Sequence, residues 1–499
     1  MNIALLGPIR QVARAGDTLR AWRMFVDAGG LLATDPQSSS LKGRLLKDRA
    51  LKAVGAERAA LLDEAEQAYL QSAGVGPATY PLINAATIAL LNDKRDQARA
   101  LAAQTIALID SGAHEAETAY WLSATRAEAY LLLDRIDGAQ AALATAIAHD
   151  GEAWEDHAAT LRQFRIILER VGQPADWLDR FRPPVSLQIS GIIGLKPGDD
   201  GAEARIVQAV RDINPGFVFG ALAAGADIVA AEAAIALGAQ LYVILPASIE
   251  AFRRDSVQAF DGNWSNRFDA LLDSAEYVEA PAETDRVSEA GIAIANEVAM
   301  GMALRKARAL ESQAIAMRIQ RRFDAAPPPG SGDAAWRGQG LQLIEVEVAG
   351  ERPNVSKPLA ILDRAAVVAT GTDAAQAGLL AAGGKLLGQS KGHAILRFDT
   401  LPAAAAGALA ASQDGRLAID YLVLDDDGLG ASTDDPFARV AHIAQTAPPG
   451  SVYASEPASH ALALHAPDLR CEAIGDIATP LGHLPVTMLF SRIGRIAVH

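Results

Sequence analysis

Helical spacing dominates the first part of the chain. Up to about residue 180, apolar residues recur at helical intervals, and alanine, leucine, arginine and glutamate are frequent. This pattern is typical of amphipathic α-helices, whereas a half-buried strand would alternate apolar and polar residues. We therefore expect helices over almost all of residues 1–182, with short turns between them.

Small and large apolar residues in this part are spaced as in a tetratricopeptide helix pair. Ala127, Tyr130, Ala139, Leu143 and Ala146 stand at relative positions 0, 3, 12, 16 and 19. Small alanines let two helices approach closely, and the larger residues fill the space between them. The same offsets fit, less regularly, at Gly16, Ala21 and Phe25, at Ala65 and Tyr69, and at Ala86, Ala98 and Ala102.

Two segments of this part resemble a known interaction domain. LKGRLLKDRAL at 41–51 and YPLINAATIALL at 80–91 are similar to the helical TRAF-binding domain of apoptosis-signal-regulating kinases and many bacterial proteins. The resemblance spans about residues 1–182 and implies a scaffold for protein partners rather than chemistry. Stacked helical repeats usually bind peptides or partner domains. An alanine-rich helical bundle without a partner is the alternative.

The pattern changes at FRPP (181–184), where two prolines end the helical part. Beyond it, short apolar segments alternate with helical ones, which is typical of a parallel sheet covered on both faces. We expect a Rossmann-like domain over 185–325, followed by the linker APPPGSGD at 326–333. Its strands are expected at 185–193, 216–222, 240–246, 275–280 and 314–319.

A turn between two glycines, after the second of these strands, is a candidate ligand site. Gly220 and Gly225 enclose it, and a helix is expected to begin near Asp227. Free backbone N–H groups at a helix start favour anions, and glycines permit close approach. Ligands of open α/β sheets bind at the carboxyl ends of strands, where Ser190 and Gly191 also lie. The structural alternative is that Asp227 caps the helix and that the alanines pack this helix against its neighbours.

The stretch GALAAGADIVAAEAAIALGAQLYVILP at 220–246 resembles the SLOG group of Rossmann-like domains. That group includes the DNA-processing protein of natural transformation and the cytokinin-activating phosphoribohydrolases. The resemblance implies that this part of the chain binds a nucleotide-derived ligand. The implied binding residues are Gly220, Ala221, Gly225 and Asp227, with Ser190 and Gly191 opposite.

The hydrolases of the SLOG group also carry a PGGxGTxxE signature, which this chain lacks. We therefore expect binding without hydrolysis. Glu232 is the nearest candidate acid, although its position on the expected helix favours a structural role. Trp264 and Arg267 have two explanations with equal support: they stack on a base of the ligand, or they pack a helix against the sheet.

The last part, residues 340–499, is expected to form an α+β sandwich. FARVAHIAQTAPPGSVYASE (437–456) and GHAILRFDTLPAAAAGALA (392–410) resemble the catalytic domain of class III adenylyl and guanylyl cyclases. Domains of this type associate face to face, so the resemblance implies a homodimer. Strands are expected at 341–350, 392–398, 416–426 and 451–456, with a helix at 436–447.

The cyclase resemblance also locates four catalytic positions, of which three lack the family's group and one is altered. The two metal-binding aspartates correspond to Glu347 and Gly392, the ribose-orienting asparagine to Ala438, and the catalytic arginine to His442. Metal ions and an arginine stabilise the charge that develops in such a reaction. The resemblance therefore implies a pseudo-cyclase, without cyclase activity, that serves dimerisation or regulation.

Composition argues against several other classes of protein and of binding site. A net charge of −15 argues against a broad nucleic-acid surface. The single cysteine, Cys471, can form neither an internal disulfide nor a cysteine-rich zinc site. The histidines lack metal-ligand spacing, and no apolar run approaches the length of a membrane span. We expect a cytoplasmic protein without a metal centre.

Together these features predict a non-catalytic signalling protein. We expect the central part to bind a nucleotide- or NAD-derived ligand and the helical repeats to bind partner proteins. The sequence implies no cofactor beyond that ligand. Two alternatives stay open: a SLOG-type hydrolase that cleaves nucleotides or NAD, and an interaction scaffold whose central part binds nothing.

Overall fold

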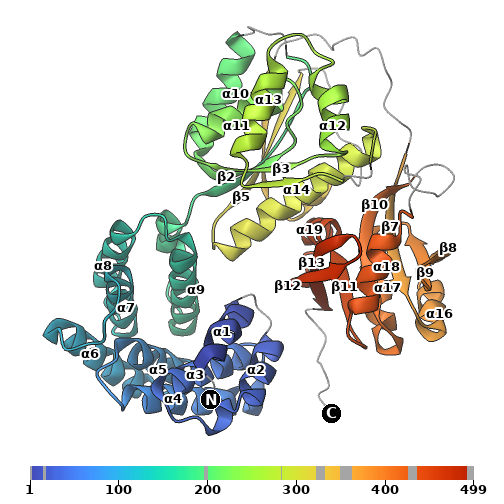
Figure 1. The fold of residues 1–499 in the computed structure, drawn as a ribbon. Coiled ribbons are helices and arrows are strands. Elements are labelled where there is room, and N and C mark those ends of the chain that lie inside the picture. The colour runs from blue at the N-terminus through green and yellow to red at the C-terminus, as the bar shows by residue number, and fades with distance from the viewer. Residues whose placement is uncertain are drawn as a thin grey trace. The chain divides into compact units, whose positions relative to one another are not determined.

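The chain forms two compact units in the computed structural model, Met1–Pro183 and Pro184–His499. The described part of the first unit contains only helices, and the second unit contains two sheets (Figure 1). Among the described helices, none has the length and apolarity needed to cross a membrane. The described residues are 3–14, 18–195, 200–281, 284–321, 332–348, 362–424 and 435–491.

The helices of the first unit pack in consecutive pairs: α1 with α2, α3 with α4, α5 with α6, and α7 with α8. The helical prediction for this part is confirmed over the described residues. Short 3-10 segments lie at Ile3–Leu5, Gly30–Leu32 and Asp176–Phe181. The α-helices are α1 (Leu6–Arg14), α2 (Thr18–Asp27), α3 (Pro36–Ala50), α4 (Gly55–Ala73), α5 (Thr79–Leu91), α6 (Arg95–Ser111), α7 (Ala119–Leu132), α8 (Ile136–His149) and α9 (Trp154–Val171).

One kind of turn joins α5 to α6 and α7 to α8. Asp93 and Asp134 adopt the left-handed conformation in these turns, with φ of 63° and 59°. Aspartate tolerates this conformation better than most residues. The next backbone N–H then bonds back to a carbonyl of the preceding helix, at 2.8 Å in both turns. The two helix pairs are therefore local structural repeats.

The tetratricopeptide-like positions lie in the core of this unit. Tyr130 is half-buried, and Gly16 lies outside the described residues. The other positions are at most 1% exposed, so small and large residues interdigitate as the spacing predicts. These buried residues are Ala21, Phe25, Ala65, Tyr69, Ala86, Ala98, Ala102, Ala127, Ala139, Leu143 and Ala146.

The first sheet of the second unit has six parallel strands in the order β4-β3-β2-β1-β5-β6. The order reverses at β1, whose neighbours are β2 on one side and β5 on the other. All five strands expected between 185 and 319 are present, with ends shifted by a few residues. The strands are β1 (Val185–Gly191), β2 (Pro215–Gly220), β3 (Gln240–Ile244), β4 (Tyr277–Glu279), β5 (Ala314–Arg321) and β6 (Gln342–Val348).

Helices cover both faces of this sheet. Val218 on β2 joins the core that lies under α10, α11 and α13, whereas Phe217 faces α14, whose Lys306 Nζ lies 4.5 Å from the ring centroid. Both faces of β2 are therefore buried, as expected for a central parallel strand. The helices are α10 (Asp200–Ile213), α11 (Ala226–Ile235), α12 (Ile249–Phe252), α13 (Trp264–Ser274), α14 (Glu289–Ala309) and α15 (Gly332–Gly338), and a π-helical turn follows α12 at Arg253–Val257.

The second sheet has seven strands in the order β12-β13-β11-β10-β7-β9-β8. Its described pairs are antiparallel except for the parallel pair of β10 and β11. The strands are β7 (Asp363–Thr370), β8 (Lys385–Ser390), β9 (His393–Phe398), β10 (Leu417–Leu424), β11 (Val452–Ser455), β12 (Leu469–Thr479) and β13 (Gly482–Ser491), and the helices are α16 (Asp373–Ala381), α17 (Leu401–Ala411), α18 (Ala438–Thr446) and α19 (Glu456–His465), with a 3-10 turn at Ser412–Asp414.

One predicted strand belongs to a different sheet. The strand expected at 341–350 forms as β6 but pairs in parallel with β5, from Ile315 opposite Gln342 to Arg321 opposite Val348. Its assignment to the C-terminal sandwich was therefore wrong. The physical reason is that Val346 and Val348 complete the apolar core beneath α10. The expected linker at 326–333 falls mostly outside the described residues.

Helix α14 joins the two sheets within the second unit. One of its faces contacts β1, β2 and β5, and another contacts α19 of the seven-stranded part. The approach is closest at Gly301, where an added Cβ would lie 1.8 Å from the carbonyl oxygen of His460. No larger residue fits at 301 without moving one of the helices.

Candidate functional site

The reversal of strand order at β1 places several predicted residues at one edge of the six-stranded sheet. Gly191 ends β1, and Gly220 ends β2 beside it. An added Cβ on Gly191 would lie 2.5 Å from the Cβ of Ala226, and one on Gly220 would lie 2.6 Å from the carbonyl oxygen of Ile189. Both glycines are therefore required for close packing of strands and helix at this edge.

The segment that follows β1 crosses the start of α11. Ile193 forms an isolated bridge with Gly225, and the Ala226 N–H donates to the Ile192 carbonyl at 3.2 Å. Gly225 has φ of 119°, and its Cβ position lies 2.9 Å from the Leu195 nitrogen. This glycine thus serves an approach between two backbone segments of the chain itself. Ser190 and Ala221 are half-buried at the same edge.

Asp227 is a buried acid near the start of α11. Its side chain is 5% exposed, and Oδ2 accepts a hydrogen bond from the Ala223 N–H at 3.3 Å. Oδ1 lies beside Gly191 without a hydrogen bond of normal geometry. The cap residue of α11 is Gly225 rather than Asp227. The capping explanation of this aspartate therefore does not describe its contacts.

Burial sets the protonation of Asp227. Loss of water raises the pKa of this carboxyl group from 3.8 to about 7, and the backbone N–H groups of Ala223 and Gly191 offset only part of that effect. Near neutral pH both forms are therefore populated. Such a group either accepts or donates a hydrogen bond, which suits recognition of a hydroxyl group.

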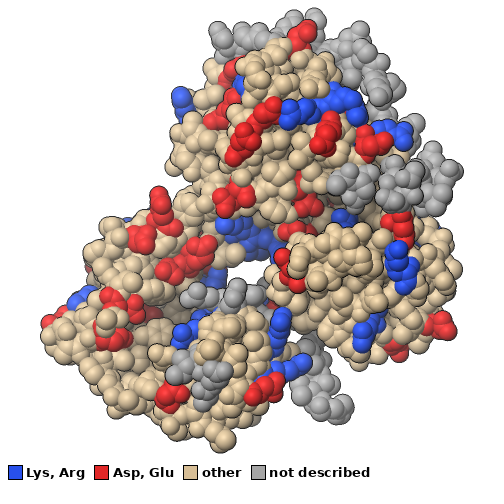
Figure 2. Space-filling view, in the orientation of Figure 1, with Lys and Arg blue, Asp and Glu red and all other residues tan. Residues whose placement is uncertain are grey.

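Trp264 and Arg267 pack α13 against α11. Arg267 forms two hydrogen bonds with Glu232, from Nε to Oε1 at 2.8 Å and from Nη2 to Oε2 at 2.5 Å. Its guanidinium carbon lies 4.4 Å from the Trp264 ring centroid, and Trp264 is 2% exposed. These contacts favour the packing explanation of all three residues. Figure 2 shows acidic and basic side chains interleaved over the six-stranded part.

Glu232 and Asp227 lie on different sides of α11. The two positions are five residues apart, which corresponds to about 140° around a helix axis. Glu232 therefore faces α13, where Arg267 holds it, whereas Asp227 faces β1 and the preceding turn. The structure does not bring the two acids together as a catalytic pair.

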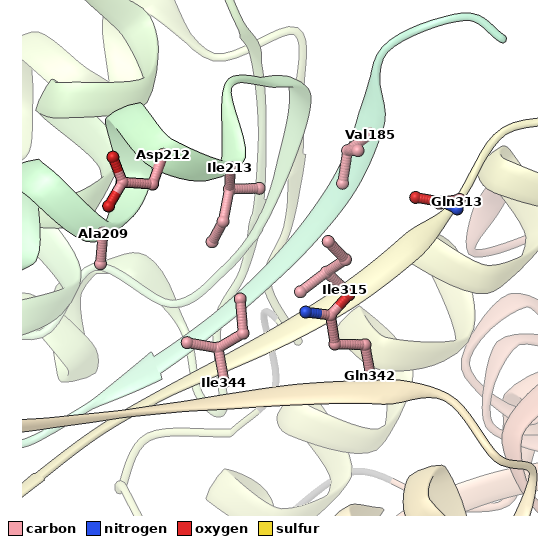
Figure 3. Close-up of a pocket in the computed structure, with 8 residues that line it drawn as sticks. All are labelled: Val185, Ala209, Asp212, Ile213, Gln313, Ile315, Gln342 and Ile344. Atoms are coloured by element: carbon pink, nitrogen blue, oxygen red, sulfur yellow. The ribbon is translucent and has the colours of Figure 1, made fainter. Parts of the chain in front are cut away.

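An open apolar groove lies at the opposite edge of the same sheet. Its volume is about 360 Å³, and it lies between the end of α10 and the starts of β1, β5 and β6 (Figure 3). None of the predicted ligand-binding residues lines it. Its lining residues are Val185, Ala209, Asp212, Ile213, Gln313, Ile315, Gln342 and Ile344.

The four cyclase-like positions do not share one site. Gly392 lies in the two-residue turn between β8 and β9, with φ of 77° after Lys391 at 48°, as such a hairpin requires. Ala438 and His442 lie one turn apart on α18, a helix that packs against the seven-stranded sheet. Glu347 lies on β6, in the six-stranded sheet. The glutamate expected to replace a metal ligand is thus in another part of the fold.

The residue after Ala438 has a defined structural role. Arg439 binds the carboxylate of Asp420 through Nε at 2.7 Å and Nη2 at 2.9 Å. Asp420 has no exposed surface, and Ser455 donates a further hydrogen bond to it at 2.5 Å. These bonds hold α18 and β11 against β10. The described part of the chain contains no group of three acidic, histidine or cysteine residues suited to a metal ion.

Sequence reasoning missed a buried polar cluster on α14. Glu297 accepts hydrogen bonds from Arg364 at 2.5 Å and from Tyr421 at 2.9 Å. His465 Nε2 also lies 3.0 Å from its Oε2. Burial first, and then the Glu297 charge, raises the pKa of Tyr421 above its usual value. A lone carboxylate among the apolar residues of 295–304 was the available signal.

Residues 9–91 match the TPR-S family, described as Tetratricopeptide Repeats-Sensor. The match runs from within α1 to the end of α5. The start of the chain carries tetratricopeptide-like repeats. Repeats of this kind generally mediate protein–protein interactions, so an interaction or sensor role is supported for the first unit.

Two solved structures show distant similarity. An adenylate/guanylate cyclase/hydrolase from Silicibacter pomeroyi is 16% identical over 26% of this chain and 98% of its own, with a TM-score of 0.22. A mutant O-GlcNAc transferase from Thermobaculum terrenum is 12% identical over 63% of this chain and 58% of its own, with a TM-score of 0.20. Scores this low carry no argument about function. No curated protein matches the chain.

Proposed function

We propose that this chain is a regulatory protein without catalytic activity, which binds a nucleotide-derived ligand in its six-stranded part and partner proteins through its helical repeats. The observation that carries the ligand proposal is Asp227. Its carboxyl group is buried at the carboxyl ends of parallel strands, and Oδ1 has no hydrogen bond of normal geometry. A ligand hydroxyl, such as that of a ribose, would satisfy this oxygen.

The place of Asp227 in the sheet supports the same proposal. Ligands of parallel α/β sheets bind where the strand order reverses, and β1 is the strand at the reversal. The half-buried Ser190 hydroxyl and the Ala221 backbone lie at this edge. We propose Ser190, Gly191, Gly220, Ala221, Gly225 and Asp227 as the walls of the site. Trp264 and Arg267 enter the proposal only as the packing that supports α11.

The contacts of the candidate acids favour binding over catalysis. Glu232 is held by Arg267 and is not free to act as the acid of a hydrolase. In the seven-stranded part, Gly392 has no side chain and Ala438 no polar group, so neither can bind a metal or a ribose. We propose that this part is a pseudo-cyclase that serves regulation or association with a second copy.

Thermal unfolding with a ligand panel tests the proposal. The panel holds ATP, GTP, NAD, ADP-ribose and cyclic mono- and dinucleotides, each with and without Mg²⁺, and every sample is checked for turnover. A ligand at about 100 times its Kd adds roughly 2.7 kcal/mol. We expect one compound to raise the Tm of the wild-type chain, and Asp227→Ala to reduce the shift.

Glu232→Gln is the matched control, because it changes an acid on the same helix that faces away from the site. Its ligand-induced Tm shift is expected to equal that of the wild type. Conversion of any compound would contradict the non-catalytic role. The absence of a shift throughout the panel would leave the chain as an interaction scaffold alone.

A further inference from the structure

Helix α9 does not simply continue the stack of helix pairs in the first unit. It contacts both α5 and α7, which belong to successive pairs. In a stacked array each repeat contacts only its neighbours, so a further stacking helix would not reach α5. Figure 1 shows α9 on the inner side of the curve that α3 to α8 form. Helix α9 therefore lies across the inner faces of α5 and α7.

Apolar side chains of α9 fill the space between those helices. Leu161, Phe164 and Leu168 have no exposed surface and share one core with Ile83 of α5 and with residues of α7. Ile166 packs against a second core, formed by residues of α3, α4 and α5. Positions 161, 164 and 168 lie on one side of a helix. The inner face thus binds an amphipathic helix.

A polar network fixes the position of α9 on this face. The Gln163 amide donates to Glu128 of α7 at 2.9 Å, and its oxygen accepts from Lys47 of α3 at 3.3 Å. Thr87 of α5 donates to the same Glu128 oxygen at 2.5 Å. A carboxamide has both a donor and an acceptor, so it can bridge a half-buried acid and a lysine, which a charged side chain cannot do equally well.

Two contacts toward opposite ends of α9 set its register. The Tyr120 hydroxyl of α7 lies 2.9 Å from the Thr160 hydroxyl. Near the other end, Arg170 forms an ion pair with Asp93 in the turn after α5. The helix is therefore placed by specific polar contacts as well as by apolar burial.

We propose that this inner face, which includes Lys47, Ile83, Thr87 and Glu128, is where the repeats bind their partner, and that α9 is an internal competitor for it. The partner is an amphipathic helix with apolar side chains at the spacing of 161, 164 and 168 and a carboxamide at the position of Gln163. The inference rests on the proposed partner-binding role of the repeats, and it adds the chemistry of the partner and the way its binding is regulated.

Because α9 belongs to the same chain as the repeats, it occupies the inner face more readily than a free helix of the same sequence would. A short connection typically holds a bound segment at an effective concentration in the millimolar range. A partner helix of similar sequence therefore binds only when α9 is weakened or when its own contacts are stronger. Helix α9 is followed by the 3-10 segment Asp176–Phe181, which leads into the second unit and whose Leu178 lies in the same core.

Binding of a labelled peptide tests this proposal on the full chain. The probe is a synthetic fluorescent peptide with the sequence of residues 154–171, and its binding is followed by anisotropy. Leu161→Ala in the chain weakens the internal helix without changing the inner face. We expect this variant to bind the peptide at least tenfold more tightly than the wild type. Adding Lys47→Met is expected to reduce the gain, because the peptide's glutamine loses its donor.

Glu169→Ala is the matched control on α9. Glu169 is exposed, so this variant is expected to bind the peptide as weakly as the wild type. Equal binding by the wild type, Leu161→Ala and Glu169→Ala overturns the proposal, provided that far-ultraviolet circular dichroism shows all three folded. Because the probe is the chain's own helix, such a failure would remove the competitor role without deciding whether the repeats bind a partner elsewhere.

Hydrogen exchange on the wild-type chain tests the proposal even if Leu161→Ala fails to fold. An internal competitor has to leave its site without unfolding of the array. The amides of α9 are therefore expected to exchange at least tenfold faster than those of α5 and α7 at equivalent core positions. Equal protection of the three helices would show that α9 is a permanent part of the core and would overturn the proposal.

Discussion

Glu297 on α14 accepts a hydrogen bond from Arg364 on β7, with Oε1 and Nη1 2.5 Å apart. The pair joins a helix that covers the six-stranded sheet to a strand of the seven-stranded sheet. Because the Glu297 side chain is only 2% exposed, its charge depends on protein partners. A specific polar contact thus supplements the apolar packing between the two sheets.

Removing this charge is expected to destabilise the second unit. In Glu297→Gln, Arg364 loses its counter-charge. We expect the free energy of unfolding to fall by about 2 kcal/mol, less than for a fully buried pair, because Arg364 is 39% exposed. Urea denaturation measures the change. Glu289→Gln, at the exposed start of the same helix, is the control and is expected to change stability by less than about 0.5 kcal/mol.

A double-mutant cycle with Arg364→Met isolates the pair. We expect a coupling energy of about 1 kcal/mol or more between positions 297 and 364, since the two side chains are in direct contact. Additive effects of the two substitutions would show that each residue acts through its other neighbours. In that case the pair would not be the link between the sheets.

Asp227 is expected to make stability fall as pH rises from about 4 to 7. The pKa of this carboxyl group is raised from 3.8 to about 7 in the folded chain. The native state therefore binds more protons than the unfolded state in that window, and the lost stability approaches about 4 kcal/mol at most. Asp227→Asn should raise the Tm at pH 8 and change it little at pH 4. An equal Tm change at both pH values would contradict the raised pKa.

Gly301 is expected to tolerate no side chain. An alanine Cβ at 301 would meet the His460 carbonyl oxygen at 1.8 Å, so α14 and α19 would have to move apart. We expect Gly301→Ala to lower the free energy of unfolding by about 1–3 kcal/mol. Gly338→Ala is the matched control, because its added Cβ meets no atom within 4 Å. Equal Tm values for the two variants would disprove the tight helix approach.

Breaking the bond between Arg439 and Asp420 is expected to be costly. Arg439→Met leaves the fully buried Asp420 carboxylate without its counter-charge, and such losses are about 3–5 kcal/mol. Arg470→Met, at an exposed position on β12, serves as the control for loss of one positive charge. Chemical denaturation of both variants measures the difference. A loss below about 1 kcal/mol for Arg439→Met would mean that Ser455 and the Tyr421 N–H together satisfy Asp420.

Local patterns identified most elements but not every sheet partner. The helical spacing before residue 180 and the apolar strands between 185 and 319 were found correctly. Strand β7, with the sequence DRAAVVAT, was missed because alanine is not typical of strands. Strand β6 was found but assigned to the wrong sheet, since its apolar residues fit either core. Pairing depends on distant segments that no local window contains.

The candidate site, too, was predictable from the sequence only in part. The glycines at 191, 220 and 225 were recognised from the sequence, and each permits a close approach. The sequence did not show that the segment after β1 crosses the start of α11. It also left the explanations of Trp264 and Arg267 equal, whereas the contacts with Glu232 favour packing. Those contacts join helices that are far apart along the chain.

Spacing along the chain thus determined what each segment can be, because helix and strand periods depend on neighbouring residues. Small residues at fixed offsets were enough to indicate helical repeats and tight strand-to-helix turns. Only the tertiary structure decided which surfaces are occupied: α9 lies on the inner face of the repeats, and Glu297 is buried between two sheets. The free energy of such contacts depends on burial, and burial is a property of the whole folded chain.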